Sequence, residues 1–266
     1  NADGEAMFKI IVGRDAERRL KADQVERFAS WRPASQRPGA CIDMRPVLIF
    51  GASRGVGLLL ARLLRQKDIP VFAMLRSEVA RADLGAAGAL VSHGDAFSVC
   101  DVEHACALPQ AEFDVVSTLG GLGADGRYVD DEGNINVINS AAAHSVRRFI
   151  LVTSIRCGDM APYRSERAIA AFGAAVDAKT RAEEHLWRTL PQGTAIRPGG
   201  LRSEPATGRG ILTKDPEMHG FIHRADVADL VARALRDEST AGHAFAAADA
   251  DQVKSVNPLA PYPLAA

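Results

Sequence analysis

The chain has 266 residues, of which 47% are hydrophobic and 24% charged, and its formal net charge is -1. This size and composition are typical of one large globular α/β domain with a short appendage. Since basic residues are not in excess, we expect neither nucleic acid nor an anionic membrane surface as a partner.

The spacing of cysteines and histidines predicts no metal site. Cys41, Cys100, Cys106 and Cys157 form no CxxC pair, and His104 with Cys106 has no second pair beside it. We interpret the cysteines as reduced thiols. The chain has no apolar run of about 18 residues, which a membrane span needs, and its first residues lack the pattern of a signal peptide. We therefore expect no membrane contact and a cytoplasmic location.

Residues 1–45 are interpreted as an N-terminal extension with its linker. A short apolar run predicts a strand at 8–12, and acid–base pairs four residues apart favour an exposed helix at 15–31. A linker rich in helix-breaking residues follows at 32–39. We expect this extension to lie apart from any chemistry.

Residues 46–247 alternate between apolar runs and amphipathic stretches. The apolar runs predict strands at 47–50, 71–75, 89–91, 113–117, 149–153, 194–197 and 243–245. Helices are predicted at 58–65, around 135–142, at 165–190 and at 226–235. Such alternation needs helical crossovers on both faces of a parallel sheet. The fold class is therefore α/β, a doubly wound parallel sheet of the Rossmann type with a short N-terminal extension. Residues 248–266, rich in proline, are expected to form a loosely ordered tail.

A glycine-rich turn joins the first strand of this domain to its first helix. It reads Gly51-Ala52-Ser53-Arg54-Gly55-Val56-Gly57. Gly51 permits the tight turn, Gly55 lets the backbone approach a pyrophosphate, and Gly57 lets the helix pack closely on the strand. The N-terminus of the helix attracts the phosphates. We interpret this segment, with Ser53, Arg54 and Val56, as a dinucleotide-binding turn; a turn that serves packing alone is the alternative.

Two arginines favour NADP(H) over NAD(H) as the cofactor. NAD-binding folds usually place an acid at the end of the second strand, where it holds the ribose hydroxyls. This chain has Arg76 there, and a guanidinium suits a 2′-phosphate. Arg54, inside the turn, offers a second positive charge. The alternative is that both arginines are only solvated.

The motifs of residues 46–247, taken in order, resemble the short-chain dehydrogenase/reductase superfamily. More narrowly, they resemble its atypical branch of NmrA-like and flavin (biliverdin-B) reductase-like proteins. The matching segments are the glycine turn, Gly94-Asp95, Ser117-Thr118-Leu119-Gly120, Val152-Thr153-Ser154, Lys179, Arg197-Pro198-Gly199-Gly200 and His223-Arg224-Ala225-Asp226-Val227. Each motif alone is common, but their order is typical of the superfamily.

The resemblance implies roles on the adenine side and in the middle of the cofactor. Asp95 would approach the adenine. Thr118, Leu119 and Gly120 would line the middle of the dinucleotide.

Other roles implied by the resemblance lie around the nicotinamide. Lys179 would hydrogen-bond the nicotinamide ribose, and the backbone of Pro198 and Gly199 would flank the nicotinamide ring. Thr153 would contact the cofactor, and Ser154 would lie near the nicotinamide or the substrate.

One departure from the family pattern bears on catalysis. Many members use a tyrosine four residues before the lysine as the proton donor, because the lysine lowers the pKa of that tyrosine. Here that position holds Ala175. Tyr163, in the loop after the fifth strand, is either a substitute acid or a wall of the pocket. Ser154, Lys179 and Tyr163 are thus the candidate catalytic residues.

Three further polar residues remain, of which two have alternative interpretations and one is interpreted as structural. His223 either reaches the pocket as a proton donor or braces the helix that follows it. Asn139 either braces the loops of the site or makes a simple polar contact. His144 follows an apolar helix face and is interpreted as structural.

The sequence and the family resemblance together predict an NADPH-dependent oxidoreductase. We expect it to transfer a hydride to a small conjugated acceptor, such as a flavin, a quinone or a bilin. The alternative is an NADP-binding regulatory or assembly protein without turnover, which would use a protein partner. An isomerase or epimerase that keeps its cofactor bound is a third hypothesis. The expected partner of the leading hypothesis is a small-molecule substrate.

Overall fold

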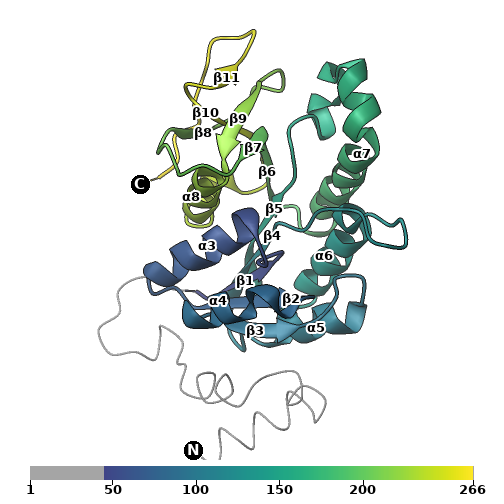
Figure 1. The fold of residues 1–266 in the computed structure, drawn as a ribbon, viewed down its shortest axis with the longest axis vertical. Coiled ribbons are helices and arrows are strands. Elements are labelled where there is room, and N and C mark those ends of the chain that lie inside the picture. The colour runs from purple at the N-terminus through teal and green to yellow at the C-terminus, as the bar shows by residue number, and fades with distance from the viewer. Residues whose placement is uncertain (1–44, 266) are drawn as a thin grey trace, which may run out of the picture.

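Parallel strands dominate the computed structural model, which describes residues 45–265. Within that range the main sheet has eight strands in the order β3-β2-β1-β4-β5-β6-β10-β8 (Figure 1). Every neighbouring pair is parallel except β10 and β8. The strands are β1 Val47–Phe50, β2 Val71–Leu75, β3 Leu90–His93, β4 Phe113–Ser117, β5 Val146–Val152, β6 Thr194–Pro198, β8 Gly210–Thr213 and β10 Ala244–Asp249. The predicted doubly wound α/β fold is confirmed, with one antiparallel strand added at its edge.

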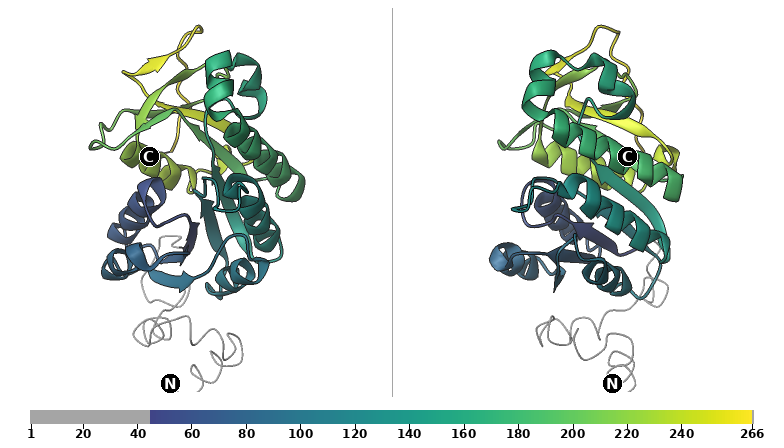
Figure 2. Two further views of the ribbon diagram at one scale, coloured as in Figure 1. Left: turned by 45° about the vertical axis from the view of Figure 1, so that its right-hand side comes forward. Right: turned by 90° about the vertical axis from the view of Figure 1, so that its right-hand side faces the viewer.

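Helices cover both faces of this sheet (Figure 2). One face carries α3 Gly55–Gln66, α4 Arg81–Ala86 with the short turn η2 Glu78–Ala80 before it, and α8 Arg224–Ala234. The other carries α5 Val99–Ala107, α6 Asn134–Ala142 and α7 Glu166–Thr189. A π-helical turn, η3 Val129–Gly133, precedes α6, the 3-10 turn η4 Gly158–Tyr163 precedes α7, and η5 Glu238–Thr240 follows α8. No helix within residues 45–265 is long and apolar enough to cross a membrane.

The pleat of the strands divides the core into two layers. Val47 and Ile49 of β1 belong to the cluster under α3 and α8, while Leu48 and Phe50 belong to the cluster under α5, α6 and α7. Successive side chains of a strand point to opposite faces, and here both faces are covered. This is why β1 reads as four consecutive apolar residues, all of them buried.

A second, three-stranded sheet was not predicted from the sequence. It consists of β7 Gly200–Arg202, β9 His219–His223 and β11 Val253–Lys254, in the order β11-β9-β7. In Figure 1 it lies beside β8 and β10, at the opposite end of the molecule from β3. These strands are short and carry many exposed residues, so they give no apolar run in the sequence.

Several predicted boundaries differ from the structure. The first helix begins at Gly55 rather than at 58, because the glycine turn itself enters the helix. The third strand runs from 90 to 93 and the fifth from 146 to 152. The helices α4 and α5 were not predicted. The strand at 8–12 and the helix at 15–31 lie outside the described residues.

The C-terminal segment is more fixed than the expected loose tail. β10 continues to Asp249, and Ala248 and Asp249 are fully buried. Further on, the Tyr262 N–H donates to the Leu212 carbonyl at 2.7 Å, and the Tyr262 ring lies 4.6 Å from the ring of Phe245. The segment lacks long regular structure but packs on the main sheet.

Candidate functional site

The glycine turn leaves no room for side chains where β1 meets α3. Gly51 and Gly55 have φ angles of +88° and +58°, in the left-handed region that favours glycine. A Cβ atom at Gly57 would lie 2.5 Å from the Gly51 carbonyl oxygen, and one at Gly51 would lie 2.6 Å from Thr118 Oγ1. The backbone of this turn is therefore bare and closely packed on the sheet side, the shape needed by a turn that binds phosphates.

The N-terminus of α3 is open to an anion. Arg54 is the N-cap residue, with an extended backbone, and within the described residues no side chain caps the helix there. The first turn of α3 also contains no acidic residue. Its N–H groups and the positive end of the helix dipole are thus available to a ligand, and a pyrophosphate fits this donor set.

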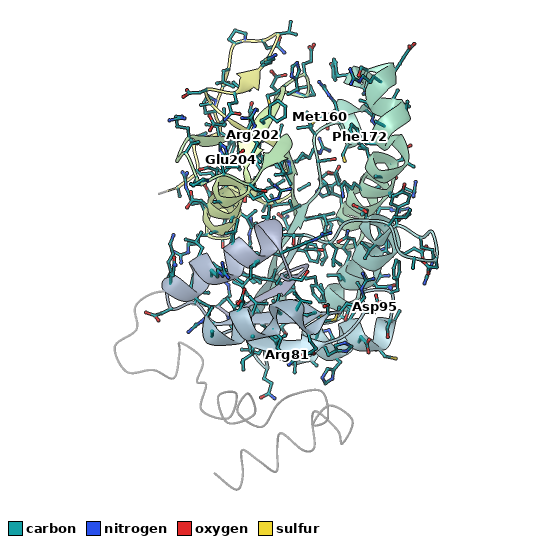
Figure 3. All side chains as sticks on the ribbon, in the orientation of Figure 1. Arg81, Asp95, Met160, Phe172, Arg202 and Glu204 are labelled. Carbon is teal, nitrogen blue, oxygen red and sulfur yellow. The ribbon has the colours of Figure 1, made fainter. Side chains whose placement is uncertain are left out.

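Arg76 and Asp95 lie together at the carboxyl ends of β2 and β3. Arg76 Nη1 is 4.0 Å from Asp95 Oδ2, and the Arg76 side chain is 68% exposed. The other carboxylate oxygen, Oδ1, accepts a hydrogen bond from the Phe97 N–H at 3.0 Å. Figure 3 labels Asp95 at this end of the sheet. An exposed pair of this length adds little stability, so the Arg76 guanidinium is free to take a better anion. Arg54 is exposed as well.

The segment after β4 connects the glycine turn to α7. The Thr118 hydroxyl donates toward the carbonyls of Phe50 and Gly51, at 3.2 and 3.1 Å. Further along, a Cβ atom at Gly120 would lie 2.9 Å from Asp130 Oδ1 and 3.2 Å from Lys179 Nζ. Thr118 thus braces the turn from the side, while Gly120 lies against an ion pair from α7.

That ion pair joins Lys179 of α7 to Asp130 of η3. Asp130 is 1% exposed, and its second oxygen accepts the Gly121 N–H at 2.6 Å. Burial lowers the pKa of Lys179 to about 8, and the negative charge of Glu183 opposes that shift. Asp130 was not predicted as a site residue from the sequence. Its one signal was an acidic run at 130–132, and such runs are usually solvated.

One helical turn after Lys179, Glu183 anchors α7 to the ends of β5 and β6. Arg197 of β6 donates to both oxygens of the Glu183 carboxylate, at 3.0 and 2.8 Å, and the Thr153 hydroxyl donates to it at 2.6 Å. Arg197 also pairs with Asp159 of η4. Burial alone would lower the pKa of Arg197, but its ion pairs with Glu183 and Asp159 outweigh that effect and raise the pKa. The Thr153 side chain is thus committed to this buried network.

The loop after β5 holds Ser154 and leads to Tyr163. Ser154 Oγ is half-buried, 3.6 Å from Cys157 Sγ. Arg156 has a φ angle of +73°, which is uncommon outside glycine. The Gly158 N–H donates to Thr180 Oγ1 of α7 at 3.2 Å, which fixes the start of η4. Tyr163 ends η4 and is 40% exposed.

Pro198 and Gly199 lie at the end of β6, between two other strands. The Gly199 N–H donates to the Ala247 carbonyl of β10 at 2.9 Å. On its other side a Cβ atom would collide with the Gly220 carbonyl oxygen of β9. Both residues are buried. The close passage of β9 is the reason that glycine stands here.

The other three polar residues considered in the sequence, His223, Asn139 and His144, lie as follows. His223 is 6% exposed and faces Asp226, with 3.6 Å between His223 Nδ1 and Asp226 Oδ2. Asn139 Oδ1 lies 2.7 Å from His185 Nε2 of α7, a polar contact between helices. His144 Nδ1 lies 2.8 Å from the Ser140 carbonyl oxygen one turn earlier.

Comparison with known proteins gives a consistent picture of the domain. Residues 51–238 match the model of the NAD(P)H-binding family. The structure is similar to ChuY of Escherichia coli O157:H7, described as an anaerobillin reductase, with a TM-score of 0.72, 35% sequence identity and coverage of 80% of this chain and 100% of ChuY. YhfK of Bacillus subtilis, named an uncharacterized sugar epimerase, is 32% identical over 210 residues, covering 77% of this chain and 94% of YhfK. Sanguinarine reductase of Eschscholzia californica is 29% identical over 164 residues, covering 59% and 55%.

We predict that Gly57→Ala prevents tight dinucleotide binding. The new methyl group would lie 2.5 Å from the Gly51 carbonyl, so the turn must open and move its N–H groups. The change should weaken NADPH binding at least about tenfold, measured by nicotinamide fluorescence. Gly85→Ala in α4 is the control, because a Cβ atom there meets no atom within 4 Å. Equal affinity of Gly57→Ala and wild type would show that the turn serves packing alone.

We also predict that Cys157 takes no part in thiol chemistry near neutral pH. Burial and the charge of Glu183 raise its pKa to about 11, so only about one thiol in a thousand is ionised at pH 8. Iodoacetamide should therefore label the exposed Cys100 far faster, and labelling of Cys157 should rise about tenfold for each pH unit. Cys106, buried with its pKa raised to about 11, is the internal control. Peptide mass spectrometry measures all three; rapid labelling of Cys157 at pH 8 would contradict this prediction.

Proposed function

The chain belongs to the NAD(P)H-binding family, and from that premise we propose that it is an NADPH-dependent oxidoreductase that reduces a small conjugated acceptor such as a flavin, a quinone or a bilin. The observation that carries the proposal is the continuity of the site. The bare turn at Gly51 contacts Thr118, and the segment from Thr118 to Gly120 leads directly to Lys179. One end of this path suits phosphates, and the other suits a ribose.

The turn holds the pyrophosphate in this proposal. Its glycines, with Ser53 and Val56, present backbone N–H groups, and the uncapped N-terminus of α3 adds its dipole. Arg54 and Arg76 hold the 2′-phosphate, and both side chains are exposed at this end of the sheet. Asp95 draws Arg76 toward the adenosine half of the cofactor.

Lys179 orients the nicotinamide ribose, and Asp130 keeps the Lys179 ammonium in place. Thr153 supports the site through its hydrogen bond to Glu183. The backbone of Pro198 and Gly199 flanks the nicotinamide. Ser154 lies beside the reacting centre. When bound, the reduced nicotinamide supplies a hydride. The acceptor gains that hydride and one proton, which comes from the Tyr163 hydroxyl or from water, so the acceptor is reduced by two electrons.

The choice of a conjugated acceptor rests on Ala175. A simple ketone develops an alkoxide as the hydride arrives and needs an acid held beside it, but α7 contains no tyrosine. A conjugated acceptor spreads the incoming charge over its π-system, so protonation can follow from solvent. The similar proteins named anaerobillin reductase and sanguinarine reductase support a reductase of this kind.

We predict that the protein binds NADPH more tightly than NADH and that Arg76→Ala removes most of the preference. A hydrogen bond to a charged group contributes about 1.5–3 kcal/mol, or roughly 10–100-fold in affinity. Arg147→Ala is the matched control, since Arg147 is an exposed arginine paired with Glu238 near the start of β5. Fluorescence titration with NADPH and NADH measures the two affinities of the wild type and of each variant. Equal binding of NADPH and NADH by the wild type would exclude a 2′-phosphate site.

The acceptor is tested by adding flavin mononucleotide, menadione or biliverdin to the NADPH complex and following the loss of nicotinamide absorbance. We expect oxidation with a conjugated acceptor and none with cyclohexanone. Lys179→Met should lower kcat/KM about 100-fold, whereas Lys67→Met, at the exposed end of α3, should not. Tight binding without oxidation by any acceptor would favour a regulatory protein, and interconversion of nucleotide sugars without net oxidation would favour an epimerase.

A further inference from the structure

Three groups able to ligate a metal meet where β9, α8 and β10 converge. His223 ends β9, Asp226 lies in the first turn of α8, and Asp249 ends β10. One ligand atom from each lies within 4.8 Å of the others. The residues are 6%, 4% and 0% exposed, so the cluster is nearly closed to solvent.

The imidazole of His223 points an unpartnered nitrogen into this cluster. Within residues 45–265, Nδ1 is buried and has no hydrogen-bond partner. It lies 3.6 Å from Asp226 Oδ2 and 4.0 Å from Asp249 Oδ2. These separations are too long for hydrogen bonds. Two ligands around one tetrahedral ion are about 3.3–3.6 Å apart for metal–ligand bonds of about 2.0–2.2 Å. The separation from Asp226 is within that range, and the 4.0 Å separation from Asp249 is slightly longer than it.

Negative charge exceeds the positive charge that the structure places against it. The two carboxylates accept hydrogen bonds from neighbouring loops. Asp226 Oδ1 accepts from the Gly208 N–H at 2.8 Å, and Asp226 Oδ2 accepts from the N–H and the hydroxyl of Thr207 at 3.0 and 3.3 Å. Asp249 Oδ2 accepts from the Thr207 hydroxyl at 2.5 Å, and Asp249 Oδ1 accepts from the Asp251 N–H at 2.9 Å. Arg209 Nε is 3.8 Å from Asp249 Oδ1 and is half exposed.

The Arg209 guanidinium makes its shorter contact, 2.8 Å, with Asp251. On the outer side of the imidazole, Glu204 Oε2 is 3.7 Å from His223 Nε2 and adds a third acid. Figure 3 labels Glu204 above α8. Arg224 follows His223 in the chain, but its guanidinium donates to the Ser203 hydroxyl at 2.7 Å rather than to a residue of the cluster. Glu204 is 66% exposed, so the buried negative charge is that of Asp226 and Asp249 alone. A cation held between these two carboxylates would offset the part of their desolvation that the hydrogen bonds leave.

We propose that His223 Nδ1, Asp226 and Asp249 bind a divalent first-row metal ion, with Zn²⁺ as the best fit. One imidazole nitrogen and two carboxylate oxygens are ordinary Zn²⁺ ligands, and a tetrahedral ion keeps a fourth position for water. The ion ties together the end of β9, the start of α8, the loop at 203–209 and the end of β10. Its role is structural, and it is independent of the proposed reductase activity. This proposal differs from the expectation from sequence that the chain has no metal site.

The test uses the full chain without a histidine tag, treated with EDTA and titrated with ZnCl₂ by calorimetry. We expect one Zn²⁺ per chain and a higher melting temperature in its presence. His223→Gln should weaken binding by at least about 100-fold, because even substitutions outside the ligand set often cost 10–100-fold. His219→Gln is the matched control, since His219 is an exposed histidine on the same strand.

A second pair of variants and a spectrum guard against loss of folding. Asp249→Asn should also lose Zn²⁺, while Asp251→Asn, on the exposed neighbour, should retain it. Circular dichroism shows whether each ligand variant is folded. If either variant is unfolded, Co²⁺ is added to the wild type instead, and intense visible absorption that Zn²⁺ abolishes supports the site. No uptake of Zn²⁺ or Co²⁺ by the wild type, or uptake unchanged in folded His223→Gln and Asp249→Asn, would overturn the proposal.

Discussion

The buried ion pair between Glu183 and Arg197 is the interaction on which the rest of the site depends. It links α7 to β6, and through the Thr153 hydroxyl it also includes the end of β5. Losing one partner would leave an uncompensated buried charge, which typically costs about 3–5 kcal/mol. Lys179 stands one turn before Glu183 on α7, so the position of its ammonium follows from this anchor. The same arginine reaches Asp159 and thereby fixes η4.

Two regions of different charge lie along the edge of the sheet formed by the carboxyl ends of its strands, one positive and one nearly neutral. At β1 and β2 the helix N-terminus, Arg54 and Arg76 create a positive environment suited to phosphates. At α7 the Lys179 ammonium is neutralised by Asp130 and partly buried, so it acts as a positioned hydrogen-bond donor more than as a free charge. Thr118 and Gly120 join the two regions. A long ligand that is anionic at one end and nearly neutral at the other matches this division.

The similar proteins carry names from two kinds of chemistry, reduction and sugar epimerisation, on one nucleotide-binding domain. A shared fold does not decide between them, because function depends on the groups placed around the reacting atoms. In this chain the position one turn before Lys179 is Ala175, and Tyr163 comes from η4 instead. The proposed reaction therefore depends on acceptor chemistry and positioning more than on an acid built into α7.

The sequence by itself determined the features that are local. Four apolar residues, a glycine turn and an amphipathic helix follow one another in β1 and α3, and each is specified by its own residues, so the fold class and the position of the bare glycine turn could be predicted. The pairs Asp130–Lys179 and Glu183–Arg197, and the cluster of His223 with Asp249, could not. Their members are 49, 14 and 26 residues apart, and no spacing rule connects them. Only the packing of α7 and α8 against the strand ends brings these charges together, because burial, and not sequence distance, decides which charged groups must find partners.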